Sequence, residues 1–110
     1  MFKKDNRLSK TKDVMAASKR GRSFFSPFFL VKFLKTADAA RVTVVVSTKV
    51  SKKAVTRNRI KRIIRDCIRH SLLSLKSGDY VVIVKPSIAR LEAVQMREEV
   101  LGLLQKTKLL

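Results

Sequence analysis

The spacing of apolar residues in the first half of the chain predicts one short helix followed by two strands. Small and apolar residues recur at helical spacing between Ser9, which can cap a helix, and Gly21, which can end one. Residues 24–34 are aromatic and aliphatic and predict a strand, in which Pro27 marks an edge position or the strand's start. Residues 41–47 are rich in β-branched side chains and predict a second strand, which we expect to pair with the first as an antiparallel hairpin.

The second half of the chain predicts a long helix, a buried strand and a final helix. After a basic loop at residues 48–53, helical spacing of apolar residues extends over residues 54–75 and is closed by Gly78. Residues 79–85 are a continuous apolar run of the kind that is buried on both faces of a sheet. Residues 91–105 predict the last helix, with apolar residues over half of its circumference. The order helix, strand, strand, helix, strand, helix predicts an α+β fold in which helices pack on a small mixed sheet.

Length and charge narrow the class of protein. A chain of 110 residues fits a single domain, of which we expect the polar, basic residues 1–8 to form a flexible arm. It carries 26 Lys and Arg residues against 8 Asp and Glu residues, a net charge of +18. A compact chain with this charge repels itself unless a polyanion neutralises it, and nucleic acid is favoured over an acidic membrane surface. Residues 49–69 alone hold 9 basic side chains and 1 acidic side chain, so we expect the binding surface to include this segment.

The predicted helix over residues 54–75 divides into an apolar face and a basic face. At about 100° per residue, one arc of about 140° collects the side chains expected to face the core, namely Ile60, Ile63, Ile64, Cys67, Ile68 and Leu75. An adjacent arc of about 100° forms a basic ridge, made by Asn58, Lys61, Arg62, Arg65 and Arg69. A merely solvated face would interleave glutamate, because like charges at this spacing weaken a helix. The ridge therefore predicts contacts with a phosphate backbone, which Arg57 and Lys53 extend at the start of the helix.

The side chains of the sequence form no recognisable catalytic or metal-binding group. His70 is the only histidine and Cys67 the only cysteine, so a zinc site and an internal disulfide are excluded. The eight acidic residues are scattered, and the three glycines form no phosphate-binding loop. We therefore expect no catalytic residues and no metal ligands in the polypeptide. With no secretion signal and no run of roughly 20 apolar residues, we expect a cytoplasmic protein that contacts no membrane.

The residues around the basic ridge favour RNA over DNA and resemble a known family. The sequence has no second short helix beside the basic one and no heptad zipper, so DNA is not an expected partner, whereas an exposed basic helix next to a strand pair suits a folded RNA. Residues 54–65, Ala-Val-Thr-Arg-Asn-Arg-Ile-Lys-Arg-Ile-Ile-Arg, resemble the Arg-Asn-Arg signature of the bacterial ribonuclease P protein subunit. The resemblance covers nearly the whole chain, since it extends to residues 6–8, Gly21, residues 41–50 and residues 79–84.

The resemblance implies a fold and a function. The family's fold is similar to the second domain of a small-subunit ribosomal protein, with a left-handed β-α-β crossover through the basic helix. It implies an accessory subunit of a ribonucleoprotein endoribonuclease, whose catalytic RNA matures the 5′ ends of tRNA with magnesium. The partners would be this catalytic RNA and precursor tRNA. Carried over by position, the residues that contact the catalytic RNA would be Lys53, Arg57, Asn58, Arg59, Lys61, Arg62, Arg65 and Arg69.

The resemblance also implies a cleft between the sheet and the first helix that binds the 5′ leader of precursor tRNA. The family usually places aromatic residues at the positions of Val14 and Ser18, and neither of these side chains can stack on a base. Aromatic rings elsewhere could compensate, because they accept single-stranded bases. The candidates are Phe24, Phe25, Phe28, Phe29 and Phe33.

Strand alternation sorts these phenylalanines further. We expect Phe29 and Phe33 on one sheet face as candidate leader contacts, with Val31 between them pointing the other way. Lys32 is the stronger candidate for an exposed polar contact. A position in the core is the competing interpretation, and it is favoured for most of the phenylalanines.

Two other functions stay open from the sequence. One is a structural RNA-binding protein of the ribosome, which would co-purify with intact ribosomal subunits. The other is a DNA-binding regulator, whose salt-dependent affinity would be equal for a folded RNA and a duplex DNA.

Overall fold

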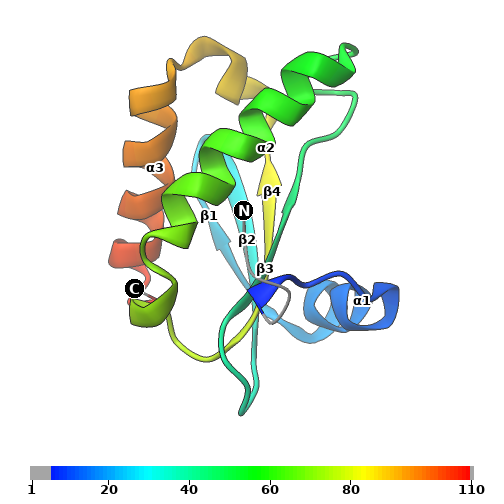
Figure 1. Ribbon diagram of the computed structural model, residues 1–110, viewed down its shortest axis with the longest axis vertical. Coiled ribbons are helices and arrows are strands. Elements are labelled where there is room, and N and C mark those ends of the chain that lie inside the picture. Colours follow the sequence, from blue (N-terminus) through cyan, green and yellow to red (C-terminus); the bar gives the residue numbers. More distant parts are fainter. Residues whose placement is uncertain (1–5, 110) are drawn as a thin grey trace.

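The structure, a computed structural model, describes residues 6–109. A first helix precedes three strands, a second helix follows them, and a fourth strand and a third helix complete the chain (Figure 1). In chain order the elements are α1 (Thr11–Arg20), β1 (Arg22–Phe25), β2 (Phe29–Lys35), β3 (Arg41–Val45), α2 (Ala54–Arg69), the short η2 (Leu72–Ser74), β4 (Gly78–Val84), the short η3 (Pro86–Arg90) and α3 (Ala93–Lys106).

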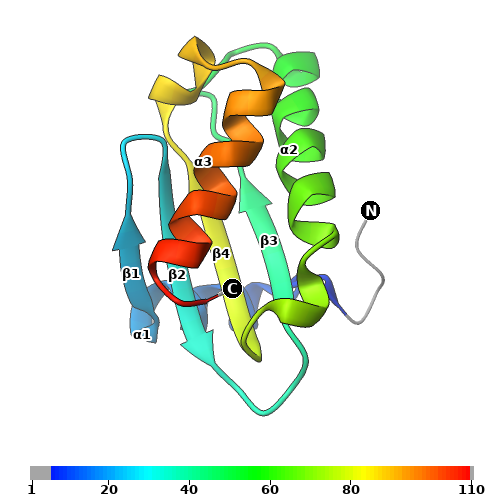
Figure 2. The same cartoon turned by 90° about the vertical axis from the view of Figure 1, so that its left-hand side faces the viewer.

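The four strands form one mixed sheet in the order β1-β2-β4-β3. β2 pairs antiparallel with both β1 and β4, whereas β3 and β4 run parallel and are connected through α2. Figure 2 looks onto the face covered by α3 and shows β3 pointing up with β4 to its left. Because α2 packs into the same core as α3, on that near face, the β3-α2-β4 connection is left-handed, against the usual right-handed rule. The α+β class and the crossover implied by the resemblance are confirmed.

Two predictions about the strands are wrong. Residues 24–34 form the β1–β2 hairpin instead of one strand. The cause is Ser26, whose Oγ accepts hydrogen bonds from the backbone N–H groups of Phe28 (3.3 Å) and Phe29 (3.0 Å) and so closes a turn at Pro27. In addition, β3 does not pair with β2, because β4 lies between them. β4 is apolar and buried on both faces, and such a strand gains most from the centre of a sheet.

One face of the sheet, called the core face, packs against α2 and α3. Phe29, Val31 and Phe33 of β2 are all buried in this core, so the prediction that Val31 points away from the two phenylalanines is wrong. Positions two residues apart lie on the same side of a strand. The helices cover these side chains with Ile60, Ile64, Cys67 and Ile68 of α2 and with Met96, Val100, Leu103 and Leu104 of α3.

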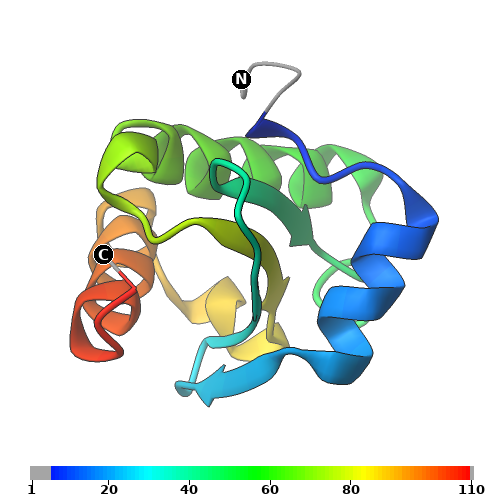
Figure 3. The same cartoon turned by 90° about the horizontal axis from the view of Figure 1, so that it is seen from below.

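The opposite face, called the open face, is crossed at one end by α1. Figure 3 shows α1 and α3 on opposite sides of the sheet. A small second cluster holds α1 in place, in which Leu8, Ala17 and Val81 are buried. Strand register puts two further side chains on this face, because Phe25 pairs with Leu30, and Lys32 pairs with Val81.

The ends of two helices differ from the prediction. α1 begins at Thr11 after Lys10, which forms no side-chain cap, so Ser9 is not the capping residue. α2 ends at Arg69 instead of continuing to residue 75, because the chain turns into η2. Leu75 is nevertheless buried in the core, as its apolar character predicts.

The segment before α1 is held against the sheet. Asn6 Nδ2 donates a hydrogen bond to the carbonyl of Ala40 (2.9 Å), and the backbone N–H of Leu8 donates to the carbonyl of Val42 (3.2 Å). The flexible arm predicted over residues 1–8 is therefore wrong for residues 6–8. Residues 1–5 lie outside the described residues.

Candidate nucleic-acid interface

The predicted division of the central helix into two faces is confirmed for α2. Ile60, Ile64 and Ile68 are buried in the core and Ile63 packs against it, and the basic ridge lies on the other side of the helix. A shallow groove of about 520 Å³ follows the ridge, lined by Asn58, Lys61, Arg62, Arg65 and Asp66. Arg69, the fifth residue of the ridge, is exposed at the end of the helix. Helical spacing alone brings these groups together, because residues three and four apart are neighbours on a helix surface.

Arg57 holds the basic loop at residues 48–53 against the start of α2. Its Nη1 donates hydrogen bonds to the carbonyls of Ser51 (3.0 Å) and Lys52 (2.9 Å). Lys53 precedes the helix without a side-chain cap, and the first turn contains no acidic residue. The positive end of the helix dipole therefore adds to the charge of the loop and favours an anion there.

The cations along α2 differ in whether they have an acidic partner. Arg69 Nη2 lies 2.9 Å from Asp66 Oδ1, and this hydrogen bond lowers the pKa of the Asp66 carboxyl. Among residues 6–109, no ion pair involves Lys61, Arg62 or Arg65. Most of the positive charge of the ridge is thus available to an external phosphate.

A second depression connects the ridge with the open face. It has a volume of about 330 Å³ and is lined by Arg7, Leu8, Ser9, Val14, Val42, Thr43 and Arg65. Arg65 lies in both depressions. Arg65 thus joins the ridge to the depression beside α1, which also contains Arg7.

The predicted leader-binding residues differ in where they lie and in how exposed they are. Val14 lines the second depression, and Ser18 and Lys32 are half-buried. Phe29 and Phe33 are only 0% and 7% exposed, because they point into the core face. The prediction that these two phenylalanines contact the leader is wrong, and the competing interpretation as core residues holds for them.

Sequence reasoning missed the ion pairs of Arg41, one of which connects β3 to α1. Arg41 donates to both carboxylate oxygens of the buried Asp79, at 2.8 Å each, and to Asp13 of α1 at 3.3 Å. The hydrogen bond with Asp79 is the largest cause that raises the pKa of Arg41, so the guanidinium stays charged. Parallel register places Arg41 beside Asp79. The signal in the sequence was one charged residue at the start of each of two apolar strands.

Other candidate reactive groups lie apart from the ridge or are covered. Cys67 is buried, and burial raises the pKa of its thiol. The ring of His70 is exposed, and its Nε2 lies 3.9 Å from Asp66. Within residues 6–109, no group of three or more His, Cys, Asp or Glu side chains is placed to hold a metal ion. Over the same residues, every helix is too short or too polar to span a membrane.

Comparison with known proteins assigns the family. The model of the family described as Ribonuclease P matches residues 2–108. The chain belongs to the ribonuclease P protein family. Among curated relatives in this family, the ribonuclease P protein component of Xylella fastidiosa is 31% identical over 105 residues, which are 96% of this chain and 78% of the relative. That of Xanthomonas oryzae is 44% identical over 66 residues, which are 60% of this chain and 46% of the relative. The match thus spans less than half of the Xanthomonas relative.

Solved structures of ribonuclease P proteins share the whole fold. The Staphylococcus aureus protein superposes with a TM-score of 0.89 at 27% identity, covering 96% of this chain and 98% of that one. The Thermotoga maritima protein gives a TM-score of 0.80 at 31% identity, covering 91% and 96%. The recognition of this family from the Arg-Asn-Arg segment and its flanking strands is confirmed.

Proposed function

We propose that this chain is the protein subunit of a ribonuclease P, in which a catalytic RNA removes the 5′ leader of precursor tRNA. The observation that carries the proposal is the basic ridge, where Lys61, Arg62 and Arg65 share one groove and have no acidic partner among the described residues. A row of such cations neutralises a phosphate backbone. The family match favours this function over a ribosomal or DNA-binding one.

The two surfaces have separate tasks in this proposal. The ridge, with Lys53, Arg57 and Arg59 beside it, anchors the protein on the catalytic RNA. Asn58 is exposed within the ridge groove, where its amide can donate to and accept from a base edge or a 2′-hydroxyl. The open face beside α1, with Val14, Ser18 and Lys32, receives the leader of the precursor tRNA.

The chemistry belongs to the RNA in this proposal, and magnesium serves it there. Among residues 6–109, no three or more His, Cys, Asp or Glu side chains come together to hold a divalent ion. The protein instead supplies fixed positive charge, which screens the repulsion between the catalytic RNA and its substrate. A holoenzyme with the protein should therefore need less magnesium than the RNA alone. Cytoplasmic localisation follows, since tRNA precursors are processed where they are made.

Reconstitution with the cognate catalytic RNA tests the proposal. We expect the protein to stimulate cleavage of precursor tRNA at low magnesium, and we expect the stimulation to shrink as magnesium is raised. A variant with Lys61→Glu, Arg62→Glu and Arg65→Glu should fold but lose the stimulation, since it inverts the charge of the ridge. A wild-type protein that leaves cleavage at low magnesium unchanged would show the proposal to be wrong.

A further inference from the structure

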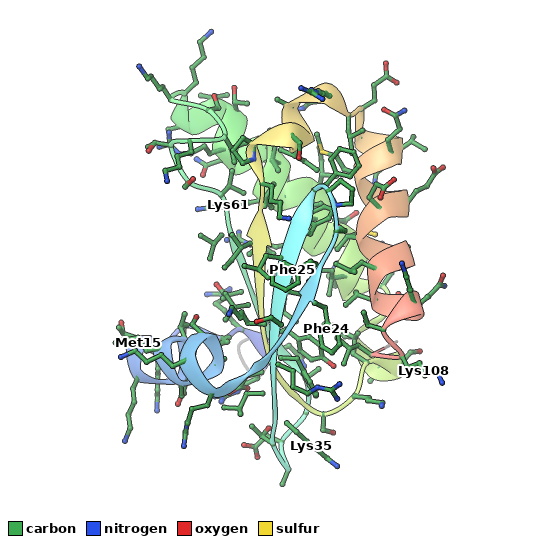
Figure 4. All side chains as sticks on the ribbon, turned by 180° about the vertical axis from the view of Figure 1, so that it is seen from behind. Met15, Phe24, Phe25, Lys35, Lys61 and Lys108 are labelled. Carbon is green, nitrogen blue, oxygen red and sulfur yellow. The ribbon has the colours of Figure 1, made fainter. Side chains whose placement is uncertain are left out.

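One phenylalanine among residues 6–109 is left largely uncovered. Phe25 is 68% exposed, whereas Phe24 and Phe28 pack against the core and Phe29 and Phe33 lie inside it. Strand register places Phe25 at the β1 edge, opposite Leu30 on the open face, and Phe25 also lines a hollow of about 230 Å³ with Glu99 and Lys106 of α3. Figure 4 shows it in front of the strands and well away from Met15 of α1. The ring therefore lies outside the depression beside Val14.

The turn that follows Phe25 is tied to the end of β4. Lys85 Nζ lies 5.7 Å from the centre of the Phe25 ring and donates a hydrogen bond to the carbonyl of Ser26 (2.7 Å). The backbone N–H of Lys85 donates to the carbonyl of Phe28 (2.9 Å), and the hydroxyl of Ser87 donates to that of Pro27. The β1–β2 turn is thus tied to the end of β4, and binding at the ring would cost little ordering entropy.

An exposed aromatic ring with a cation beside it suits one kind of ligand. An unpaired nucleotide presents a flat base, which stacks on an aromatic face, and a phosphate, which is attracted to an ammonium group. Lys85 occupies the space over one side of the ring, and the exposure of Phe25 leaves room for a base against it. Lys32 projects from the same face beside Ser23, within reach of a neighbouring phosphate.

We propose that Phe25 is a stacking platform for an unpaired base of the precursor tRNA leader, with Lys85 and Lys32 beside the flanking phosphates. The inference rests on the proposed function and adds a site to it. The first helix, α1, contains no aromatic residue, and Phe25 is the exposed phenylalanine among residues 6–109. The leader is the favoured source of the nucleotide because the ridge of α2 lies at the β3 edge of the sheet. Three strand spacings, about 14 Å, separate that edge from β1.

Binding to the reconstituted holoenzyme tests the site directly. The affinity of the holoenzyme is measured for precursor tRNA and for mature tRNA, which lacks the leader. We expect Phe25→Ala to weaken binding of the precursor by about 5- to 150-fold, the range given by loss of one base stack, and to leave mature tRNA unaffected. Phe25→Trp, which keeps an aromatic ring, should bind the precursor about as tightly as the wild type does. Leu73→Ala is the matched control, because Leu73 is 104% exposed and lies on η2.

Removing single bases from the leader shows which nucleotide contacts Phe25. Precursors with a single abasic nucleotide at successive leader positions should lose affinity for the wild-type holoenzyme at one position. At that position, Phe25→Ala should cause no further loss, since the ring and the base are two halves of one interaction. Equal losses from the abasic nucleotide with wild type and Phe25→Ala would overturn the inference.

The remaining outcomes separate this inference from the proposed function. If Phe25→Ala binds and cleaves the precursor as wild type does, the inference is wrong and the proposed function stands. If Phe25→Ala instead weakens binding to the catalytic RNA alone, the ring belongs to the anchoring surface and the inference is again wrong. If the wild-type protein fails to stimulate cleavage, the proposed function itself fails.

Discussion

At the scale of single residues, arginines on one helix differ in what their surroundings leave them free to do. Arg57 is committed to the carbonyls of the loop before α2, and Arg69 is paired with Asp66. Arg65 has neither restraint among the described residues, and it lines both depressions. Since a charged group without a partner in the protein gains most from an external phosphate, Arg65 is the residue from which we expect the clearest effect on RNA binding.

Replacement of Arg65 by alanine should weaken binding of the catalytic RNA without unfolding the protein. One lost charge-assisted contact, about 1.5–3 kcal/mol, corresponds to a loss of roughly 10- to 100-fold in affinity. The slope of log affinity against log salt should fall by about 1. Arg90→Ala is the control, because Arg90 is exposed on η3, outside the ridge. A melting temperature that drops far below that of Arg90→Ala would show that Arg65 is a structural residue.

At the scale of elements, the periodicity of apolar residues correctly predicted the features that depend on one segment of the chain alone. The two faces of α2, the buried β4 and the last helix all follow from spacing within one segment, and the structure confirms them. The break in residues 24–34 was missed because both strands of the hairpin are apolar, and the turn depends on the side chain of Ser26. The partner of each strand was missed because pairing is decided by the burial of the whole sheet.

In the candidate site too, features within one segment were predicted and features that join distant segments were not. The ridge could be predicted because helical geometry alone brings its members together. The burial of Phe29 and Phe33 could not, since a strand pattern states which residues share a face but not which face the helices cover. The pair of Arg41 with Asp79 joins residues 38 positions apart, and its existence depends on the parallel register of β3 and β4.

The ion pairs of Arg41 should decide how firmly α1 is held against the sheet. Arg41→Ala leaves the carboxylate of Asp79 buried without a partner, so we expect the free energy of unfolding to fall by about 3 kcal/mol in urea titrations. Asp13→Ala removes only the outer contact of Arg41, whose partner is half-buried, and should cost less than about 1 kcal/mol. Similar losses for both variants would mean that the Asp79 contact contributes little stability.

At the scale of the whole molecule, charge is distributed unevenly around the sheet. Three of the eight acidic residues, Glu92, Glu98 and Glu99, belong to α3 or its cap, on the side that covers the core face (Figure 2). The cations of the ridge that form no ion pair among residues 6–109 gather at the β3 edge, and Phe25 lies at the β1 edge, where the side chain of Lys85 reaches it from the end of β4. Under the proposed function, these two edges are the surfaces that meet RNA, and the open face joins them.

This separation predicts that the two edges contribute independently. Arg62 lines the ridge groove but not the depression beside α1. Arg62→Ala should therefore weaken assembly with the catalytic RNA and leave the binding of precursor tRNA by the assembled holoenzyme unchanged. Phe25→Ala should leave assembly unchanged and weaken the binding of precursor tRNA by the holoenzyme, which is measured with the catalytic RNA saturated by protein. In the double variant the two losses should add to within about 0.5 kcal/mol, because three strand spacings, about 14 Å, separate the two edges. A coupling energy well above that value would place both side chains on one continuous RNA contact, and the two edges would then not act as separate surfaces.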